Sequence, residues 1–158
     1  MDAVFIAAAT DGPAVISPAD YLEFTIPGFK QIVEAAEPLN TPVIFHPHGT
    51  FTDERFQHLV DVAIDCGIGG LQSSEGCDLA LAKRKWSDRV CILGGPDVPE
   101  VPFPGPPERV REKTREDIEA AVDGGGFIIM GSCSLYRDAP LAHLDAMIQA
   151  VHDFGVYG

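Results

Sequence analysis

The sequence predicts an α/β fold, namely a partial parallel (β/α) barrel of the TIM type with about five strand–helix units. Five short apolar runs recur along the chain, and a helical pattern follows each of them. Most runs are continuous rather than alternating, which is typical of strands covered on both faces in a parallel sheet. Neither a phosphate-loop pattern nor GxGxxG follows a strand, which favours a barrel over an open doubly wound sheet. Residues 1–158 are expected to form a single domain.

The predicted strands are short runs rich in Val, Ile and Phe that end at glycine, proline or polar residues. The second run reads Pro-Val-Ile-Phe-His-Pro-His-Gly and so places two histidines at its end. The fourth run ends in two glycines, and the fifth follows three glycines. The predicted strands are residues 4–8, 42–49, 70–72, 89–95 and 127–131.

The first two helices are indicated by their cap and stop residues. Ser17 precedes a proline and stands three residues before Asp20, a pattern typical of an N-cap with a capping box. Pro27 lies inside the apolar pattern that follows and is expected to kink or split this helix. The second helix is expected to start near Thr52 and to stop at Gly67.

The third helix is predicted from Cys77 to Trp86, with basic residues in its last turns, where cations favour the helix dipole. The fourth is predicted to begin near Thr114, whose hydroxyl can cap it together with Asp117. The fifth is expected to begin near Asp138. Its predicted buried face consists of Leu141, Leu144, Met147, Ile148, Val151 and Phe154.

One irregular segment, Pro96–Pro107, holds six of the 13 prolines. It is long for a connection in a barrel. Two interpretations stay open for it. It is either a mobile lid or partner contact, or a stiff extended spacer whose prolines restrict the chain.

The composition excludes several classes of partner. The chain has 24 acidic against 11 basic side chains and a formal net charge of -13, so nucleic acid and anionic membrane surfaces are not expected partners. No apolar run approaches the roughly 20 residues that cross a bilayer, and Asp2 stands where a signal peptide carries positive charge. The four scattered cysteines are expected to be reduced, in a cytoplasmic protein.

The ends of the predicted strands carry the residues with the clearest chemistry, because functional groups of parallel α/β proteins collect there. His46 and His48 are two residues apart and therefore point to the same face of a strand. Cys133 follows the last strand, and Glu75 follows the third. Together they offer the nitrogen, sulfur and oxygen ligands that zinc accepts. The alternative is that the two histidines only form hydrogen bonds at a strand end.

Other polar residues and thiols receive more ordinary interpretations. Asp97 follows the fourth strand and either reaches the mouth of the barrel as a catalytic residue or caps the turn into the proline-rich loop. Ser73 and Ser74 have no evident base partner, so nucleophilic catalysis by serine is not expected. Buried thiols behave as small hydrophobes. Core positions are predicted for Cys66, Cys77 and Cys91, and solvated helix surfaces for His58, His143 and His152.

In these segments the chain resembles the uroporphyrinogen decarboxylase superfamily. The resemblance covers nearly the whole chain but only the C-terminal part of that family's (β/α)8 barrel, roughly strands four to eight. It implies either decarboxylation of uroporphyrinogen III or cobalamin-dependent methyl transfer. The segments that carry it are Pro42–Gly49, Gly70–Gln72 with Asp78–Lys83, Asp88–Asp97, Gly124–Cys133, and Ala139–Met147 through Phe154–Tyr157.

The zinc methyltransferase branch, which moves a methyl group from methylcobamide to coenzyme M, is the most similar. The resemblance implies zinc ligands at His46 and Cys133, where that branch has a His-x-Cys pair and a later cysteine. His48 departs from the pattern, because it stands where the branch has cysteine. Glu75 lies near the position where these enzymes contribute a carboxylate. The decarboxylase motif Asn-Leu-Gly-His-Gly is replaced by residues 130–134, Met-Gly-Ser-Cys-Ser.

The resemblance implies zinc as cofactor, a corrinoid carried by a partner protein, and a small thiol as methyl acceptor. Two alternatives stay open, namely a metal-free decarboxylase-like protein and a non-catalytic module that binds metal or corrinoid. Five units alone leave two strand edges open. The chain is therefore expected to form a homo-oligomer or to complement a missing N-terminal half.

Overall fold

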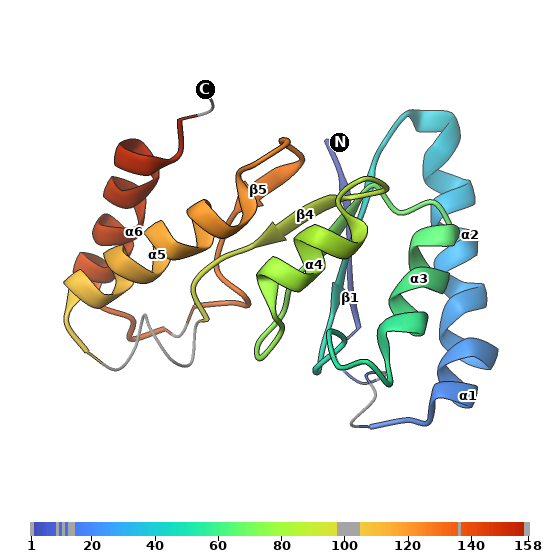
Figure 1. The fold of residues 1–158 in the computed structure, drawn as a ribbon. Coiled ribbons are helices and arrows are strands. Elements are labelled where there is room, and N and C mark those ends of the chain that lie inside the picture. The colour runs from blue at the N-terminus through green and yellow to red at the C-terminus, as the bar shows by residue number, and fades with distance from the viewer. Residues whose placement is uncertain are drawn as a thin grey trace.

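Figure 1 shows the computed structural model, which describes residues 2–8, 10, 12, 15–97, 105–135 and 137–156. Five strands form one sheet, every neighbouring pair is parallel, and the strands lie side by side in chain order. The predicted strands are therefore confirmed, three of them with shorter bounds. The strands are β1 Val4–Ala8, β2 Val43–Pro47, β3 Gly70–Gln72, β4 Cys91–Gly94 and β5 Phe127–Ile129.

Helices connect consecutive strands and pack on one face of the sheet. They are α1 Pro18–Asp20, α2 Ile26–Ala36, α3 Gln57–Asp65, α4 Leu79–Trp86, α5 Pro107–Ala121 and α6 Leu141–Phe154. A π-helical turn, η1 (Tyr21–Thr25), joins α1 to α2, and a 3₁₀ turn, η2 (Glu37–Leu39), follows α2. In Figure 1, α2 and α3 lie together at one end of the sheet, and α5 and α6 lie together at the other.

The two faces of the sheet differ in the way that a barrel segment requires. Phe45 and Ile92 point toward the helices and are fully buried. On the opposite, helix-free face, Phe5 of β1 is 54% exposed and Ile128 of β5 is 50% exposed. A doubly wound sheet carries helices on both faces, whereas a barrel carries them outside only. Sequential strand order with helices on one face therefore supports the predicted partial barrel.

The first helical segment follows its predicted signals. The Ser17 hydroxyl donates to Asp20 Oδ2 at 2.7 Å. Ser17 Oγ also accepts a hydrogen bond from the Asp20 N–H at 3.1 Å. Pro27 stands in the first turn of α2, directly after the π-helical turn, so the predicted split is confirmed. Proline is tolerated there because the first helical N–H groups have no partner inside the helix.

Two predicted helix starts are wrong. Helix α3 begins at Gln57 rather than at Thr52, because turns occupy the residues between them. Helix α5 begins at Pro107, well before Thr114, because a proline suits the first turn and does not exclude a helix. Thr114 is an interior residue of α5 with a buried side chain, and its hydroxyl donates to the Val110 carbonyl at 2.8 Å.

The predicted buried face of α6 is also partly wrong. Leu141 is 75% exposed and Ile148 is 56% exposed, whereas His143 and Ala150 are buried. The predicted solvation of His143 is therefore wrong as well. Helix α6 packs mainly against α5 at the end of the sheet, and that contact covers only part of its apolar stripe. An apolar stripe shows which positions can be buried, and the neighbours decide which are.

The core lies between β2 and the helices beside it. The Phe45 ring contacts Phe29 of α2 with centroids 4.5 Å apart, and Phe51 lies 6.5 Å from Phe45. Trp86 of α4 is 1% exposed and donates its indole N–H to Asp61 of α3 at 2.9 Å. This packing holds β2, whose end carries the two histidines, rigidly against α2 and α3.

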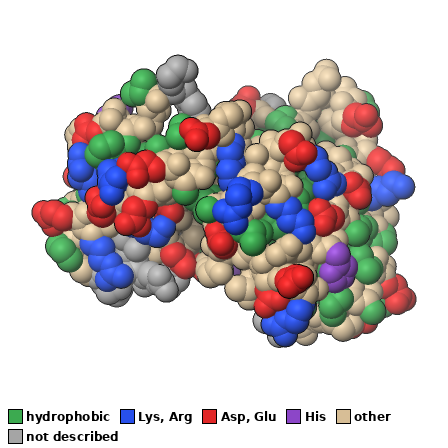
Figure 2. All heavy atoms as spheres, in the orientation of Figure 1, with side chains coloured by type: hydrophobic (Ala, Val, Ile, Leu, Met, Phe, Trp, Pro, Cys, Tyr) green, Lys and Arg blue, Asp and Glu red, His purple; other side chains and the backbone are tan. Residues whose placement is uncertain are grey.

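Acidic and basic side chains are interspersed over the helices in Figure 2, with no continuous basic surface on this face. Among the described residues, no helix combines the length and the apolar character needed to cross a bilayer. The proline-rich loop falls mostly on residues 98–104, which lie outside the described residues, so the two interpretations of that loop stay open.

Candidate metal site

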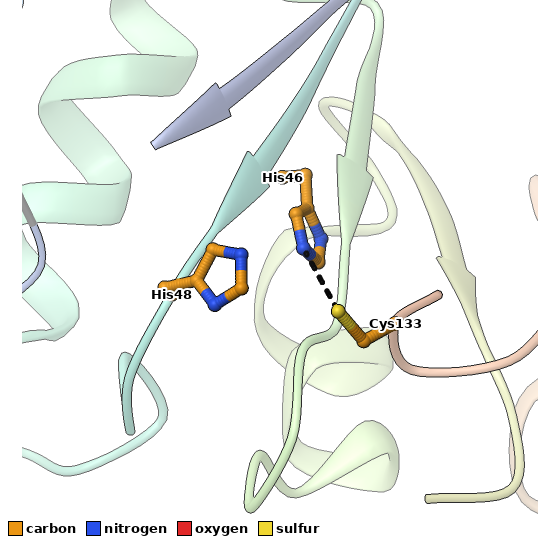
Figure 3. Close-up of side chains that lie close together, drawn as sticks. All are labelled: His46, His48 and Cys133. Atoms are coloured by element: carbon orange, nitrogen blue, oxygen red, sulfur yellow. Dashed lines mark hydrogen bonds between the residues drawn. The ribbon is translucent and has the colours of Figure 1, made fainter. Parts of the chain in front are cut away.

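The three predicted metal ligands lie together at the carboxyl end of the sheet (Figure 3). His46 belongs to β2, His48 is the first residue after that strand, and Cys133 lies four residues beyond the end of β5. Both imidazoles point to the helix-free side, as expected for residues two apart on a strand. The loop after β5 then brings the thiol to His46 across the intervening strands β3 and β4.

The distances suit a metal ion after small adjustments. Cys133 Sγ lies 3.8 Å from His46 Nε2, and the ligand atoms of His46, His48 and Cys133 all lie within 4.8 Å of one another. Zinc bonds of about 2.0–2.3 Å at tetrahedral angles place ligand atoms about 3.3–3.7 Å apart. A contraction of about 1 Å or less, within reach of side-chain rotation, would therefore close the three ligands on zinc.

Burial favours the neutral form of the first ligand. His46 is 4% exposed, and burial lowers its pKa, as does nearby His48, while Glu75 and a hydrogen bond with Gln72 raise it. Neutral imidazole has the lone pair that a metal requires. The two imidazole rings are nearly perpendicular, at 79°, with centroids 4.5 Å apart, so both can turn a nitrogen toward one point.

The surroundings of Cys133 disfavour its thiolate form. Burial raises the pKa of its thiol, and a hydrogen bond with Glu75 raises it further, while the Ser134 backbone lowers it. Neighbouring carboxylates oppose a second negative charge. The thiol is therefore held protonated unless a cation joins the site, because a metal ion favours the thiolate. The donor set and its charge fit a divalent metal ion.

Glu75 extends the group by a carboxylate. Its Oε2 lies 3.9 Å from His48 Nδ1, and its side chain also contacts the Cys133 thiol. The side chains of His48 and Glu75 are both about one-third exposed, so this side of the group is open to solvent and to a substrate. The structure thus brings Glu75 beside two of the three candidate ligands.

Asp97 does not join the candidate ligands. Its Oδ1 accepts from the Ser132 hydroxyl at 2.9 Å, and its Oδ2 accepts from the Gly76 N–H at 3.1 Å. Asp97 therefore fastens the loop that carries Glu75 to the loop that carries Cys133. It also lines a cavity of about 490 Å³ between α4 and α5, behind the site. Asp97 thus lies among the loops at the carboxyl ends of the strands, and its catalytic role stays a prediction.

Sequence reasoning missed Gln72, the last residue of β3. Its side chain is 2% exposed, and its Nε2 donates to the carbonyls of Gly131 and Ser132, both at 3.1 Å. The available signal was a long polar side chain at the end of a short buried strand, next to the histidines of the preceding strand.

The other thiols are less buried than predicted. Cys66, Cys77 and Cys91 are all half-buried rather than enclosed in the core, because each lies at the edge of a helix or a strand. Burial raises the pKa of the Cys66 and Cys91 thiols, which keeps both in the unreactive protonated form. Ser74 Oγ donates to the Gly49 carbonyl at 3.4 Å and lies 3.6 Å from the Cys77 Sγ.

Known proteins that are similar to this chain in sequence are enzymes of two kinds. The chain is 30% identical over 146 residues to uroporphyrinogen decarboxylase of Chlorobaculum tepidum, which covers 89% of this chain and 39% of that protein. It is 22% identical over 154 residues to the methylcobamide:CoM methyltransferase MtaA of Methanosarcina barkeri, which covers 97% of this chain and 42% of MtaA. This chain thus spans about two-fifths of the length of either relative.

Among solved structures, a methyltransferase from Methanosarcina mazei superposes with a TM-score of 0.80 at 21% identity, which covers 98% of this chain and 43% of that one. This likeness confirms the predicted α/β fold. The family model of uroporphyrinogen decarboxylase (URO-D) matches residues 1–154. The chain therefore belongs to the uroporphyrinogen decarboxylase family.

Proposed function

We propose that this chain is a zinc-dependent methyltransferase, or its metal-bearing part, that moves a methyl group from a corrinoid protein to a small thiol such as coenzyme M. One observation carries the proposal. Two imidazoles at the end of β2 and a thiol 87 residues away from His46 in sequence have ligand atoms within 4.8 Å of one another at the end of a parallel sheet. The relative MtaA, by its name, transfers a methyl group from methylcobamide to coenzyme M.

Zinc, when bound, would hold the acceptor thiol and favour its thiolate at neutral pH, without any redox change. The chain's own residues then have separate roles. His46, His48 and Cys133 would hold the metal, on a side of the sheet where His48 is partly open to solvent. Glu75, which lies on that open side, accepts the proton that the acceptor thiol loses at its sulfur. Asp97 keeps the loops of Glu75 and Cys133 in a fixed relation.

The donor set also predicts how the site differs from one with two cysteines. A site with two imidazoles and one thiolate donates less charge to the metal than one with two thiolates and one imidazole. The acceptor sulfur therefore keeps less negative charge, and methyl transfer is expected to be slower for His48 than for a His48→Cys variant. Comparing single-turnover rates of these two proteins at equal zinc occupancy measures this difference.

The five described strands do not close a barrel, so the proposed reaction site needs further polypeptide to cover the helix-free face of the sheet. Phe5 and Ile128 are exposed on the helix-free face, at the two edges of the sheet. The relatives are more than twice as long as the matched region. We propose that further strand–helix units complete the barrel around the metal and form the contact with the corrinoid protein. Self-association of this chain is the alternative way to cover the same face.

A second candidate function rests on the decarboxylase relatives. Uroporphyrinogen decarboxylase of Chloroherpeton thalassium is 34% identical over 143 residues, a higher identity than that of MtaA. This similarity favours a decarboxylase-like protein without metal. The third possibility, a non-catalytic metal- or corrinoid-binding module, requires metal binding without turnover.

Elemental analysis of the purified chain after incubation with zinc and desalting separates these candidates. The proposal expects about one zinc per chain in the parent and loss of zinc in His46→Ala, His48→Ala and Cys133→Ala. A Cys91→Ala variant is the matched control, because Cys91 is a half-buried thiol away from the group. Its zinc content should equal that of the parent.

Methyl transfer is then measured by incubating the zinc-loaded chain with methylcobalamin and coenzyme M, and following loss of the free thiol. Thiol loss that depends on zinc and on Cys133 supports the methyltransferase. Zinc binding without thiol loss supports the binding module, and absence of zinc binding excludes the zinc mechanism and favours the decarboxylase-like alternative.

A further inference from the structure

Gln72 lies between two of the candidate zinc ligands. In the parallel pairing of β2 with β3, Ile44 is opposite Gly70 and Phe45 is opposite Leu71, so the next pair along is His46 and Gln72. Both belong to the helix-free face, and neighbouring strands lie about 4.8 Å apart. Gln72 is therefore the cross-strand neighbour of His46. Its strand, β3, lies between β2 and the strands β4 and β5, and Cys133 follows β5.

One end of the Gln72 amide is anchored to the Cys133 loop. Its Nε2 donates to the Gly131 carbonyl and to the Ser132 carbonyl, both at 3.1 Å, and these are the two residues directly before Cys133. Both amide protons are thereby used. The bonds join β3 to a loop about 60 residues later in sequence, so they fix where the thiol stands relative to the sheet.

The other end of the amide faces an unmet hydrogen-bonding need. Gln72 Oε1 and His46 Nδ1 are both fully buried, and each lacks a hydrogen bond of normal geometry within the described part of the chain, although the Gln72 side chain lies near enough to His46 to raise its pKa. One is an acceptor, and the other becomes a donor when it carries the imidazole proton. Leaving both unpaired would be unfavourable, because a buried polar group without a partner has lost its hydrogen bonds to water. A hydrogen bond between these two atoms would satisfy both.

We propose that Gln72 is a positioning residue that sets the tautomer of His46 and the place of Cys133 at the same time. Its Oε1 accepts a hydrogen bond from the Nδ1–H of His46, so the Nε2 lone pair is directed at the metal position beside Cys133 Sγ. This inference rests on the metal site of the proposed function and adds a residue that touches no metal. It assigns Gln72 the outer-shell role that fixes the ring orientation of metal-binding histidines.

Only an amide can serve both ends. A carboxylate at position 72 would still accept from His46 but would face the Gly131 and Ser132 carbonyls with a negative charge. An apolar side chain of the same length would leave all of these groups without their partner. The two substitutions Gln72→Glu and Gln72→Met therefore separate the contact with His46 from the contact with the Cys133 loop.

The first test is metal-independent. Nitrogen-15 NMR of the metal-free parent should show His46 protonated at Nδ1 and unprotonated at Nε2. Gln72→Glu should keep that tautomer, because the acceptor is retained, whereas Gln72→Met should shift the population toward the Nε2–H tautomer. A parent protein with the proton on Nε2 would overturn the inference, whatever its zinc affinity.

The second test is zinc affinity, measured by competition with a chromophoric chelator. Gln72→Met is expected to bind zinc about 10–100-fold more weakly than the parent, the usual loss for an outer-shell partner. Gln149→Leu, an exposed glutamine on α6 that contacts Asp153, is the matched control and should leave the affinity unchanged. Unchanged affinity in Gln72→Met would refute the positioning role.

The outcomes also separate this inference from the proposed function. A parent chain that binds no zinc contradicts the proposed function, and the tautomer of His46 then still decides the Gln72 contact. A parent chain that binds zinc with the expected tautomer, but transfers no methyl group, leaves the Gln72 inference supported. Near-UV circular dichroism of each variant shows that the comparison is made between folded proteins.

Discussion

A matched pair of isoleucines tests whether helices cover only one face of this sheet. Ile92 of β4 faces the helices and is 0% exposed, whereas Ile128 of the neighbouring strand β5 is 50% exposed on the other face. They lie one register step apart, because Leu93 is the partner of Ile128 and Ile92 is the partner of Phe127. The same substitution, isoleucine to alanine, can therefore be compared at two adjacent positions.

The expected free-energy losses differ by at least about 1.5 kcal/mol. Ile92→Ala removes a fully enclosed side chain and should cost about 3–4 kcal/mol of unfolding free energy, within the range of such core truncations. Ile128→Ala loses about half of the roughly 1.5–3 kcal/mol that full burial provides, plus a small strand-propensity term, for a total near 1.5 kcal/mol or less. At roughly 2–4 °C per kcal/mol, Ile92→Ala should lower the Tm by roughly 6–16 °C.

Urea unfolding followed by far-UV circular dichroism measures both variants against the parent. Equal losses for Ile92→Ala and Ile128→Ala would refute the one-sided sheet, because Ile128 would then be packed in solution. Repeating the measurement at tenfold lower protein concentration identifies the cover, since a second copy gives a concentration-dependent midpoint. A concentration-independent, large loss at Ile128 would instead place a segment of the same chain on that face.

Further predictions concern the metal, a buried carboxylate and a buried indole. Zinc at about 100 times its Kd should raise the unfolding free energy by about 2.7 kcal/mol and the Tm by roughly 5–11 °C in thermal scans, and His46→Ala should abolish that increase. Burial raises the pKa of Asp117 despite its bond with Lys113. Ionisation of Asp117 therefore costs stability as pH rises through the folded-state pKa. From pH 4 to 7 the unfolding free energy of the parent should fall relative to that of Asp117→Asn, and equal dependence of that free energy on pH in both proteins would contradict this. Trp86→Phe should lose about 1.5–3 kcal/mol in urea unfolding, because its indole N–H bonds to the Asp61 carboxylate, and a loss under 0.5 kcal/mol would contradict that.

Local sequence signals located elements well where the residues that decide them are adjacent in the chain. The Ser17 cap is one example, because its hydroxyl needs only the N–H of Asp20 three residues later. The relation of His46 to His48 is another, because the alternation of a strand fixes which side chains share a face. In contrast, Thr114 resembled a cap by its residue type and lies inside α5, since a threonine hydroxyl can equally bond to the carbonyl four residues before it.

Burial depended on neighbours that the sequence does not name. The apolar stripe of α6 predicted a broad buried face, yet Leu141 and Ile148 are exposed while His143 is enclosed. The helix pattern gives the positions that share a face, but the width of the covered strip depends on which element lies against it. Among the described residues, the element in extended contact with α6 is α5.

The sequence by itself therefore determined the five parallel strands, the pairing of His46 with His48 on one face, and the candidate ligands at strand ends. Only the tertiary structure decided that Cys133 reaches His46. In a flat sheet, β2 and β5 lie three strand spacings apart, or about 14 Å, whereas the two ligand atoms are 3.8 Å apart. Curvature of the sheet and the loop anchored by Gln72 close that gap. Both depend on contacts between residues far apart in the chain, which no local pattern encodes.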